Sequence, residues 1–337
     1  MRILSVLFLF FIFSQVIAEP KALKPRQKEV SQVSLKKIDE TSAILVPHFG
    51  IKLYLFPDTK SDVIKILKFG EKIVYDKETL EETSDKWIPV RTEEGLTGHV
   101  IREVVLSIPK HQYLNRLIFE ADKLLSKKST SLYQRMEITD SLFQVATNGE
   151  YTGDEFVLSR TKAGYGLKRT LDSLNEKKIK PDTSAELLDF LKRHQSKLLY
   201  DYSDSVYYVD PNYFWKLIEV SPNTKHADYA AYLAAEVLPA PDCKKDLACE
   251  LETIRKSKMR YIYQFPNGNY VSIYFKDIIA KLKDITKDPD AIACYKPLPV
   301  AIQSEIGTMS RYIQEYSVRH RREIQPYIKI LQDECLN

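Results

Sequence analysis

"WKLIEVSPNTKHADYAAYLAA", from Trp215 to Ala235, is followed 44 residues later by "MRYIYQFPNGNYVSIYFKDII", from Met259 to Ile279. Both stretches carry a Pro-Asn pair at the same place. Proline does not continue the helix before it comfortably, and asparagine can cap the helix after it. Each stretch is therefore predicted to be a helix, a tight turn and a second helix.

A fainter third copy, "FQVATNGEYTGDEF", begins at Phe143 and turns at Asn148-Gly149. One helical hairpin cannot bury its apolar face alone, so hairpins of this kind stack on their neighbours. The sequence thus predicts an all-α, repeat-like helical domain over 109–337. An unrelated all-helical bundle is the alternative. A capping box of Thr183 and Glu186 is expected to start one of these helices.

The turns "SPNTKHADYAAYLAA" and "FPNGNYVSIYFKDI" resemble tetratricopeptide-like repeats of the degenerate kind found in exported bacterial proteins. The likeness covers roughly 140–285. In that family the stacked hairpins bind proteins or peptides on a concave face. The resemblance therefore implies a protein partner on the helical array.

Residues 41–108 have a different character, because short β-rich runs alternate there with turn signals. In "VIKIL" (63–67) apolar and polar residues alternate, as they do in strands with one wet face. The other expected strands are "AILV" (43–46), "IKLYLF" (51–56), "KIVYD" (72–76), "WIPVR" (87–91) and "GHVIREVV" (98–105). Several short strands in so short a segment predict a small barrel or sandwich.

This segment resembles the bacterial SH3 (SH3b) domains, through "FPDTKSDVIKILKFGEKI" (56–73) and "DKWIPVRTEEGLTGHV" (85–100). The resemblance implies an SH3-like β-barrel that contacts cell wall or a protein. Two departures fall near the face where such domains hold ligands. The family often has arginine where this chain reads Leu53-Tyr54-Leu55, and it often has tryptophan where this chain has His99. Candidate binding residues here are Tyr54, Phe56, Trp87 and His99. The alternative is that Tyr54 and His99 are exposed strand residues. Trp87 is also expected to supply the large ring of the core.

The chain begins with an arginine and a short apolar run, and small or aliphatic residues lead up to Ala18. This pattern predicts a secretory signal peptide over 1–18. The alternative, a membrane anchor, needs about 20 apolar residues, which is longer than this run. Residues 19–40 are polar and rich in lysine, and they are predicted to be a flexible spacer.

The four cysteines, Cys243, Cys249, Cys294 and Cys335, are predicted to form two disulfides, because an exported chain meets an oxidising compartment. Three pairings are possible. We favour Cys243 with Cys249 and Cys294 with Cys335, which requires Cys243 to precede a helix. No close cysteine pair suggests structural zinc.

Motifs for chemistry are scarce. The six histidines are scattered, no P-loop is present, and no metal or cofactor is expected. A Cys–His cell-wall hydrolase is the enzyme class to weigh, since SH3b domains often accompany such enzymes. One surface candidate is "YDYSDSVYYVDPNYFW" (200–215), in which Tyr207 and Tyr208 could bind a peptide or glycan. The alternative is a connector whose rings are buried between helices.

The whole chain has 50 Lys and Arg against 46 Asp and Glu, a balance that disfavours nucleic acid as a partner. We therefore predict an exported, non-catalytic envelope protein, periplasmic or secreted. It would act as an adaptor that binds a protein and possibly peptidoglycan, and no membrane span would remain after signal cleavage. The alternatives are a cell-wall hydrolase and a secreted protein that faces a host or the medium.

Overall fold

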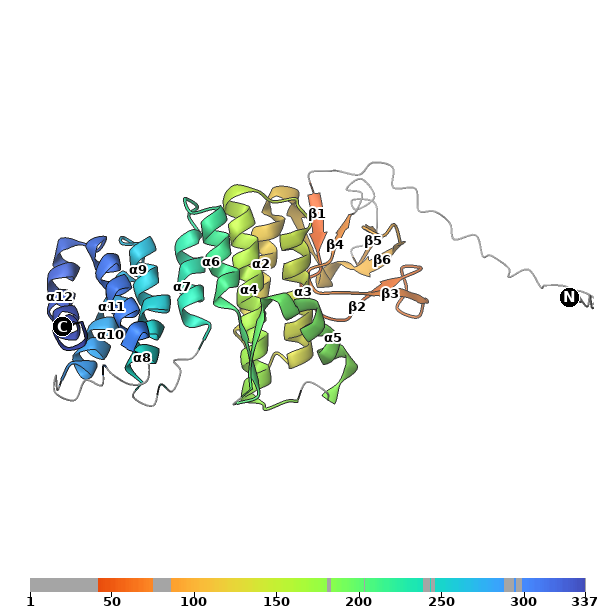
Figure 1. Ribbon diagram of the computed structural model, residues 1–337. Coiled ribbons are helices and arrows are strands. Elements are labelled where there is room, and N and C mark those ends of the chain that lie inside the picture. Colours follow the sequence, from red (N-terminus) through yellow and green to blue (C-terminus); the bar gives the residue numbers. More distant parts are fainter. Residues whose placement is uncertain are drawn as a thin grey trace, which may run out of the picture. The chain divides into compact units, whose positions relative to one another are not determined.

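The structure is a computed structural model, and it describes residues 42–74, 86–180, 183–202, 204–238, 243, 246–287, 294 and 299–336. The predicted signal peptide (1–18) and spacer (19–40) lie outside the described residues. Within this part of the chain a β-sheet comes first and a helical region follows (Figure 1), so the mixed β-plus-α class is confirmed.

The N-terminal sheet is antiparallel, and its seven strands are ordered β3-β2-β6-β5-β4-β1-β7. The bounds are β1 (Ser42–Leu45), β2 (Ile51–Tyr54), β3 (Val63–Leu67), β4 (Lys72–Val74), β5 (Trp87–Thr92), β6 (Thr97–Ile101) and β7 (Leu106–Pro109). Each of the six expected segments contains a strand, but the segment 98–105 is extended only to Ile101, since Arg102–Val104 form a 3-10 helix. The expected closed barrel is not present, because β3 and β7 lie at the two edges and do not pair with each other in the described strands. Because successive side chains point to opposite faces of a strand, the alternating apolar residues share one face. On that face, side chains of β1 to β6 form one core.

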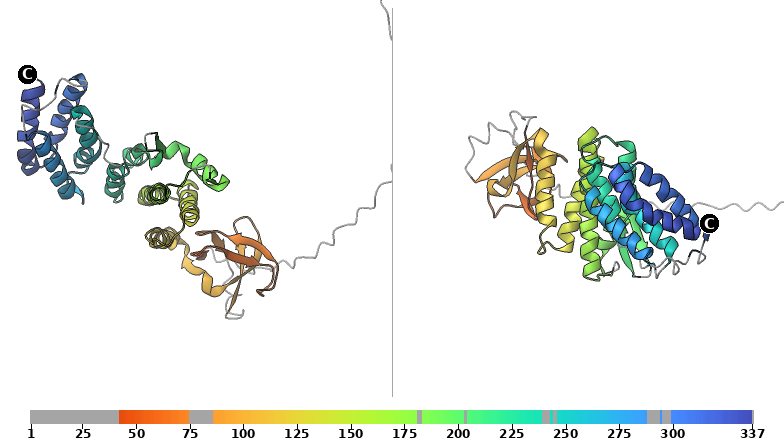
Figure 2. Two further views of the ribbon diagram at one scale, coloured as in Figure 1. Left: turned by 90° about the horizontal axis from the view of Figure 1, so that it is seen from below. Right: turned by 90° about the vertical axis from the view of Figure 1, so that its left-hand side faces the viewer.

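The helical region contains helices that pair in sequence order, as Figure 2 shows from two further sides. The bounds are α2 (Tyr113–Leu125), α3 (Leu132–Thr147), α4 (Gly153–Glu176), α5 (Ala185–His194), α6 (Pro211–Val220), α7 (Ala227–Glu236), α8 (Leu247–Ile254), α9 (Arg260–Gln264), α10 (Val271–Ile285), α11 (Pro299–Gln314) and α12 (Val318–Cys335). A π-helical segment, Arg255–Met259, joins α8 to α9. The three predicted turns fall between α3 and α4, between α6 and α7, and between α9 and α10. Each helix–turn–helix prediction is therefore confirmed.

One part of the helical prediction is wrong. Residues 109–337 are not all helical, because β8 (Leu198–Asp201) and β9 (Val206–Val209) form a two-stranded antiparallel hairpin between α5 and α6. Its β-branched and aromatic residues favour extended backbone. The side chain of Asn175 on α4 holds it, since Asn175 Nδ2 donates to the carbonyl of Tyr207 at 2.8 Å and Oδ1 accepts from the Tyr207 amide at 3.3 Å. A smaller correction concerns α5, whose N-cap is Ser184 rather than Thr183.

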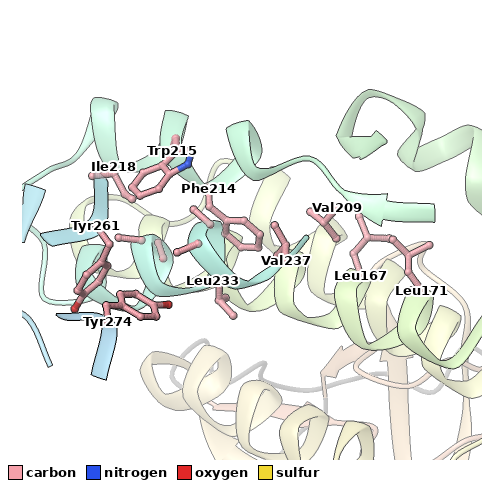
Figure 3. Close-up of a cluster of buried hydrophobic side chains, with 14 of the residues drawn as sticks. Leu167, Leu171, Val209, Phe214, Trp215, Ile218, Leu233, Val237, Tyr261 and Tyr274 are labelled. Atoms are coloured by element: carbon pink, nitrogen blue, oxygen red, sulfur yellow. The ribbon is translucent and has the colours of Figure 1, made fainter. Parts of the chain in front are cut away.

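The helices share one core that continues from hairpin to hairpin. Figure 3 shows it running from Leu171 of α4 and Val209 of β9, through α6 and α7, to Tyr261 and Tyr274. Gly164 allows α6 to approach α4, because a Cβ there would lie 2.6 Å from ring atoms of Phe214. Close contact of this kind stacks the second hairpin on the first.

The sheet also packs into this core. Phe69, in the turn before β4, is buried among helical residues, and its backbone N–H donates to Glu137 Oε1 of α3 at 2.6 Å. The next residue, Gly70, has φ +73°, and its carbonyl accepts a hydrogen bond from the Tyr113 hydroxyl of α2. A Cβ on Gly70 would overlap the Ser141 hydroxyl of α3. The boundary at 108/109 stays a prediction, but the side chains on its two sides pack together.

A contact that we call the turn clasp recurs between successive hairpins. Asp154, the second residue of α4, accepts a hydrogen bond through Oδ1 from the backbone N–H of Lys225 at 3.1 Å. Asp228, the second residue of α7, accepts through Oδ2 from the backbone N–H of Asn269, also at 3.1 Å. Lys225 and Asn269 occupy the same place in the two quoted stretches. The turn of each of these hairpins is therefore bonded to the helix that ends the preceding hairpin.

The second clasp has more bonds than the first. Asp228 also accepts hydrogen bonds from the Tyr261 hydroxyl and from Asn269 Nδ2, the latter at 2.6 Å. Gly268 makes room for this group, because a Cβ there would lie 2.6 Å from Asp228 Oδ1. The glycine of "PNGN" is thus explained by packing.

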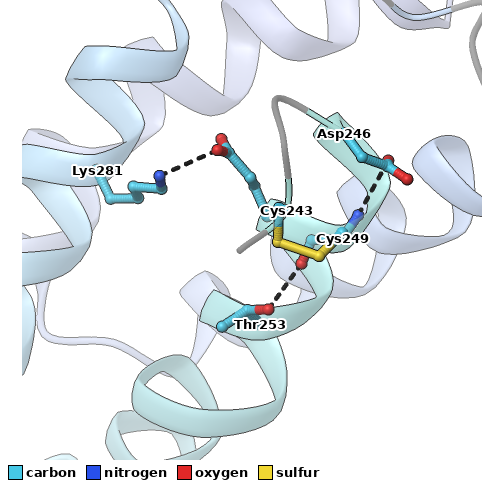
Figure 4. The surroundings of a disulfide bond; sticks show 6 residues. Cys243, Asp246, Cys249, Thr253 and Lys281 are labelled. Carbon is cyan, nitrogen blue, oxygen red and sulfur yellow. Dashed lines mark hydrogen bonds and ion pairs between the residues drawn. A yellow bond between two sulfur atoms is a disulfide. The ribbon is translucent and has the colours of Figure 1, made fainter. Parts of the chain in front are cut away.

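Both favoured disulfides are present, Cys243 with Cys249 and Cys294 with Cys335. Cys243 precedes α8, as the short pairing requires. Figure 4 shows Asp246 as the N-cap of α8, with its Oδ1 accepting from the Cys249 amide at 3.3 Å. The second disulfide joins the segment before α11 to the end of α12. Disulfides fit the predicted export of the chain.

Candidate functional site

The sheet brings three of its four candidate binding residues together. Tyr54 pairs with His99 across β2 and β6, and His99 pairs with Pro89 of β5. The rings of Tyr54 and Trp87 meet edge to face at 5.4 Å. Side chains alternate along a strand, so these residues share the face opposite the sheet core. Phe56 lies beyond the end of β2 and is 52% exposed.

Burial limits what this face can offer to a ligand. Tyr54 and Trp87 are both buried, at 9% and 7% exposed, so most of each ring is in contact with the protein itself. Burial lowers the pKa of His99, and a hydrogen bond with the backbone of Leu55 opposes this only in part. His99 is therefore favoured as a neutral ring. Among the four candidates, only Phe56 presents a large apolar surface to solvent.

The hairpin β8–β9 does not gather its two candidates on one surface. Tyr207 and Tyr208 are neighbours on a strand and project from opposite faces. The rings of Tyr207 and Tyr200 are in contact at 4.6 Å, tilted by 44°, and Tyr207 packs against the helical core, whereas Tyr208 pairs with Leu199. Both are half-buried. A connector with packed rings therefore describes this segment better than a surface that binds a peptide or glycan. Tyr202 is the exception, since it is 87% exposed.

A different set of aromatic residues lines up across successive helices. We call Tyr165, Tyr229, Tyr232 and Tyr270 the tyrosine row. Tyr165 lies on α4, Tyr229 and Tyr232 lie one helical turn apart on α7, and Tyr270 is the residue before α10. The rings of Tyr229 and Tyr232 are nearly parallel at 6.0 Å, and those of Tyr232 and Tyr270 at 3.9 Å. The row thus joins three consecutive helical hairpins.

A lysine links the first ring of the row to the second. Lys162 Nζ lies 5.6 Å from the ring centroid of Tyr165 and 5.3 Å from that of Tyr229. Its charge is balanced by Asp122 of α2, at 2.7 Å. The cation therefore holds two phenol faces in place and leaves little net charge at this end of the row.

Within the described residues, the hydroxyl groups of the row are free of hydrogen bonds to the rest of the protein. In the described part of the chain, none of the four hydroxyls is hydrogen-bonded to another residue, and none belongs to the buried polar atoms that lack a partner. All four residues are half-buried. Partial burial raises the pKa of each phenol, so each stays neutral and able to donate at physiological pH. The row can thus give hydrogen bonds to an external partner and pack its rings against it.

The residues beneath the row hold it rigid. Tyr274 of α10 is 2% exposed, and its hydroxyl donates to the carbonyl of Tyr232 at 3.4 Å. Asp228 anchors the turn that carries Tyr270 through the second clasp. Rings supported in this way lose little side-chain entropy when a partner binds.

Other chemistry receives no support from the described residues. No group of three His, Cys, Asp or Glu side chains there is placed to hold a metal ion. All four cysteines are in disulfides, so none has a thiol to act as a nucleophile. The helices of this part of the chain include none with the length and apolarity needed to cross a membrane.

Sequence reasoning did not find the tyrosine row. The available signal was weak: "YAAY" at 229–232 places two tyrosines on one helix face, and Tyr270 stands at the same place in its copy as His226. Comparison of the chain with family models, with curated proteins and with solved structures gives no match.

Proposed function

We propose that this chain is an exported, non-catalytic adaptor of the cell envelope, periplasmic or secreted. It binds an extended segment of a partner protein along the tyrosine row. The observation that carries the proposal is that four half-exposed phenols, whose hydroxyls have no partner in the described protein, line up over three helical elements. The earlier likeness to tetratricopeptide-like repeats is consistent with this use of stacked hairpins.

The spacing of the row suits an extended polypeptide. Packed helices lie about 8–10 Å apart, so a row over three of them spans about 20 Å, the length of roughly six residues of extended chain. Such a segment offers backbone carbonyls that accept hydrogen bonds from phenols. Tyrosine rings also supply contact area at low entropic cost, which makes them common in binding surfaces.

The charges around the row favour a partner segment of low charge. Lys162 is paired with Asp122, and the carboxylate of Asp228 is occupied by the turn that follows it. Recognition therefore rests on rings and hydroxyls. A segment rich in proline and small or aliphatic residues would fit this surface, because its side chains stack on phenol faces and its carbonyls stay free.

The test uses residues 19–337 with both disulfides formed and a phage-displayed library of random peptides. Peptides enriched on this protein are measured again on a variant that lacks only the row hydroxyls, Y165F/Y229F/Y232F/Y270F. We expect roughly ten-fold weaker binding or more, since each lost hydrogen bond costs about 0.5–1.5 kcal/mol. The matched control, Y133F/Y202F/Y263F, removes hydroxyls from exposed tyrosines outside the row and should bind as the wild type does.

Two results would contradict the proposal. One is a library screen that enriches nothing over a protein-free surface. The other is a set of peptides that bind the row variant as tightly as the control variant. A change in the urea midpoint of the row variant would show whether lost binding comes from lost folding instead.

We also propose that the sheet contacts cell wall, which is the role that the resemblance to SH3b domains implies. The support for this contact is the exposed ring of Phe56 beside the half-buried His99. Co-sedimentation of the chain with purified peptidoglycan tests it, with F56A and H99A as variants. If the wild type does not pellet, the sheet is better regarded as a structural or protein-binding element.

The hydrolase alternative has no free cysteine to act as a nucleophile, because all four cysteines are in disulfides. Digestion of purified sacculi tests the remaining forms of this alternative. Activity that resists serine and cysteine blockers and disappears with one carboxylate variant would replace the adaptor proposal. Fractionation of the producing cells separates an envelope protein from one released to the medium.

A further inference from the structure

A cavity of ≈ 310 Å³ opens between α4, the short 3-10 turn Gln195–Lys197 and α6. It lies apart from the tyrosine row: Arg160 of its wall and Lys162 beside the row are two residues apart on α4, which places them on nearly opposite sides of the helix. The volume is at the small end of the range for ligand pockets, about 300–1,000 Å³. The cavity is large enough for a small organic molecule.

Three cations line this cavity, Arg160, Lys197 and Lys216. In the described part of the chain none of the three forms an ion pair with a carboxylate. The wall has one acid, Asp210, which is the N-cap of α6 and accepts from the Asn212 amide at 2.9 Å. The formal charge of the lining is therefore positive, with three cations against one carboxylate.

Two of these cations are held partly away from water. The Nε atom of Arg160 is buried and has no hydrogen-bond partner, and the guanidinium lies 4.2 Å from the ring centroid of Phe156. Lys197 Nζ lies 5.1 Å from the ring centroid of Phe143, and burial lowers the pKa of Lys197. Unpaired cations at such places are unfavourable unless an anion binds beside them.

Apart from Ser196, the remaining wall is apolar or aromatic. Phe156, Tyr213, Leu217 and Val220 contribute to it, and Val220 stands at the rim with 73% of its surface exposed. The Tyr213 hydroxyl donates to the Arg160 carbonyl at 2.8 Å, which ties α6 to α4. The two walls are thus held together by the protein without any ligand.

From this arrangement we infer that the cavity binds a small organic anion, with an oxyanion group against Arg160, Lys197 and Lys216 and an apolar or aromatic body against Phe156 and Leu217. A guanidinium provides paired donors that match carboxylate and phosphate oxygens, and the two ammonium groups add charge. The shared chemistry is that of an oxyanion on an apolar group, and phosphates and carboxylates are its two sources.

The experiment is isothermal titration of residues 19–337 with phenyl phosphate, benzoate and benzyl alcohol at low ionic strength. We expect an anion to bind and benzyl alcohol, which has the ring without the charge, to bind at least ten-fold more weakly. Tighter binding of phenyl phosphate assigns the site to phosphates, and tighter binding of benzoate assigns it to carboxylates. Added salt should weaken the binding.

The variant R160M/K197M/K216M keeps the side-chain stems and removes the charges. We expect its affinity for the preferred anion to fall by at least about ten-fold, since a hydrogen bond to a charged group contributes about 1.5–3 kcal/mol. The control K192M/K276M/R322M removes the same number and kind of charges from exposed positions elsewhere. Single variants R160M and K216M keep the test decisive if the triple variant does not fold.

Three results would overturn the inference. The first is that neither anion binds at millimolar concentration. The second is that benzyl alcohol binds as tightly as the anions. The third is that the folded cavity variants bind the anions as tightly as the control does.

Discussion

Replacement of Gly70 by alanine tests whether the sheet packs on the helices as described. Two costs add at this position. A left-handed backbone costs a residue with a Cβ about 1–2 kcal/mol, and Gly70 has φ +73°. The new methyl would also overlap the Ser141 hydroxyl and lie 2.8 Å from Leu117 Cδ1. Overpacking of this kind costs about 1–3 kcal/mol, so the expected total is about 2–5 kcal/mol.

Gly50 separates the two costs. It has φ +68°, nearly the same backbone conformation, but nothing lies within 4 Å of a Cβ built there. G50A should therefore lose only the backbone part, about 1–2 kcal/mol. The difference between G70A and G50A, about 1–3 kcal/mol, measures the contact of the turn with α2 and α3. S141A in the G70A background should recover part of it, since it removes the nearest atom.

The assay is equilibrium unfolding in urea with the disulfides intact. Tryptophan emission reports on Trp87 in the sheet and Trp215 in α6, and circular dichroism reports on the helices. If the sheet and the helices share a core, the probes should give one transition that shifts together in G70A. The reasoning would be refuted if G70A were no less stable than G50A, or if the sheet unfolded alone in the wild type.

Three further predictions concern single contacts. By the loop-entropy relation, removal of the disulfide Cys294–Cys335, with a sequence separation of 41, should lower the free energy of unfolding by about 4 kcal/mol. Removal of Cys243–Cys249, with a separation of 6, should lower it by about 2 kcal/mol. Equal losses in urea unfolding would contradict this prediction. Burial opposes ionisation of Asp140, but hydrogen bonds from His194 and Arg193 outweigh it and lower its pKa below the ordinary 3.8. This stabilisation is present above pH 3.8 and is lost as the pH falls through the lowered value, so unfolding curves of wild type and D140N should converge in acid and stay apart at neutral pH. D228A should lower the free energy of unfolding by about 1–3 kcal/mol, and D154A, which loses fewer hydrogen bonds, by less than about 1 kcal/mol. Thermal unfolding measures both, and a larger loss in D154A would contradict the prediction.

Local patterns predicted the individual elements well. "VIKIL" became β3 with the expected ends, because its alternation reflects one buried face. The Pro-Asn turns and the disulfides followed from constraints that act within a few residues or from a small number of possible pairings. Where two adjacent residues could both cap a helix, as with Thr183 and Ser184, the pattern selected the wrong one.

Features that depend on distant residues were not predictable from these patterns. The hairpin β8–β9 is held by Asn175, which lies on α4, far from the hairpin in the sequence. No pattern in the hairpin sequence indicates this contact. The sheet is open because its edge strands, β3 and β7, do not pair with each other in the described strands. The alternation of apolar and polar residues does not specify which strands pair. The tyrosine row draws one ring from each of two hairpins and two from a third, so no single repeat contains the pattern.

The turn clasps give the helical array a direction. In each clasp the acceptor lies in the earlier hairpin and the donor in the later one, at Asp154 with Lys225 and at Asp228 with Asn269. In the order of the sequence, the carboxylate of each of these two clasps therefore comes before the turn that it binds. Loss of hairpins from the C-terminal end leaves the earlier turns with their hydrogen bonds. Loss from the N-terminal end leaves the next turn without the carboxylate that accepts its hydrogen bond. The two clasps therefore make each of these later turns depend on the hairpin before it.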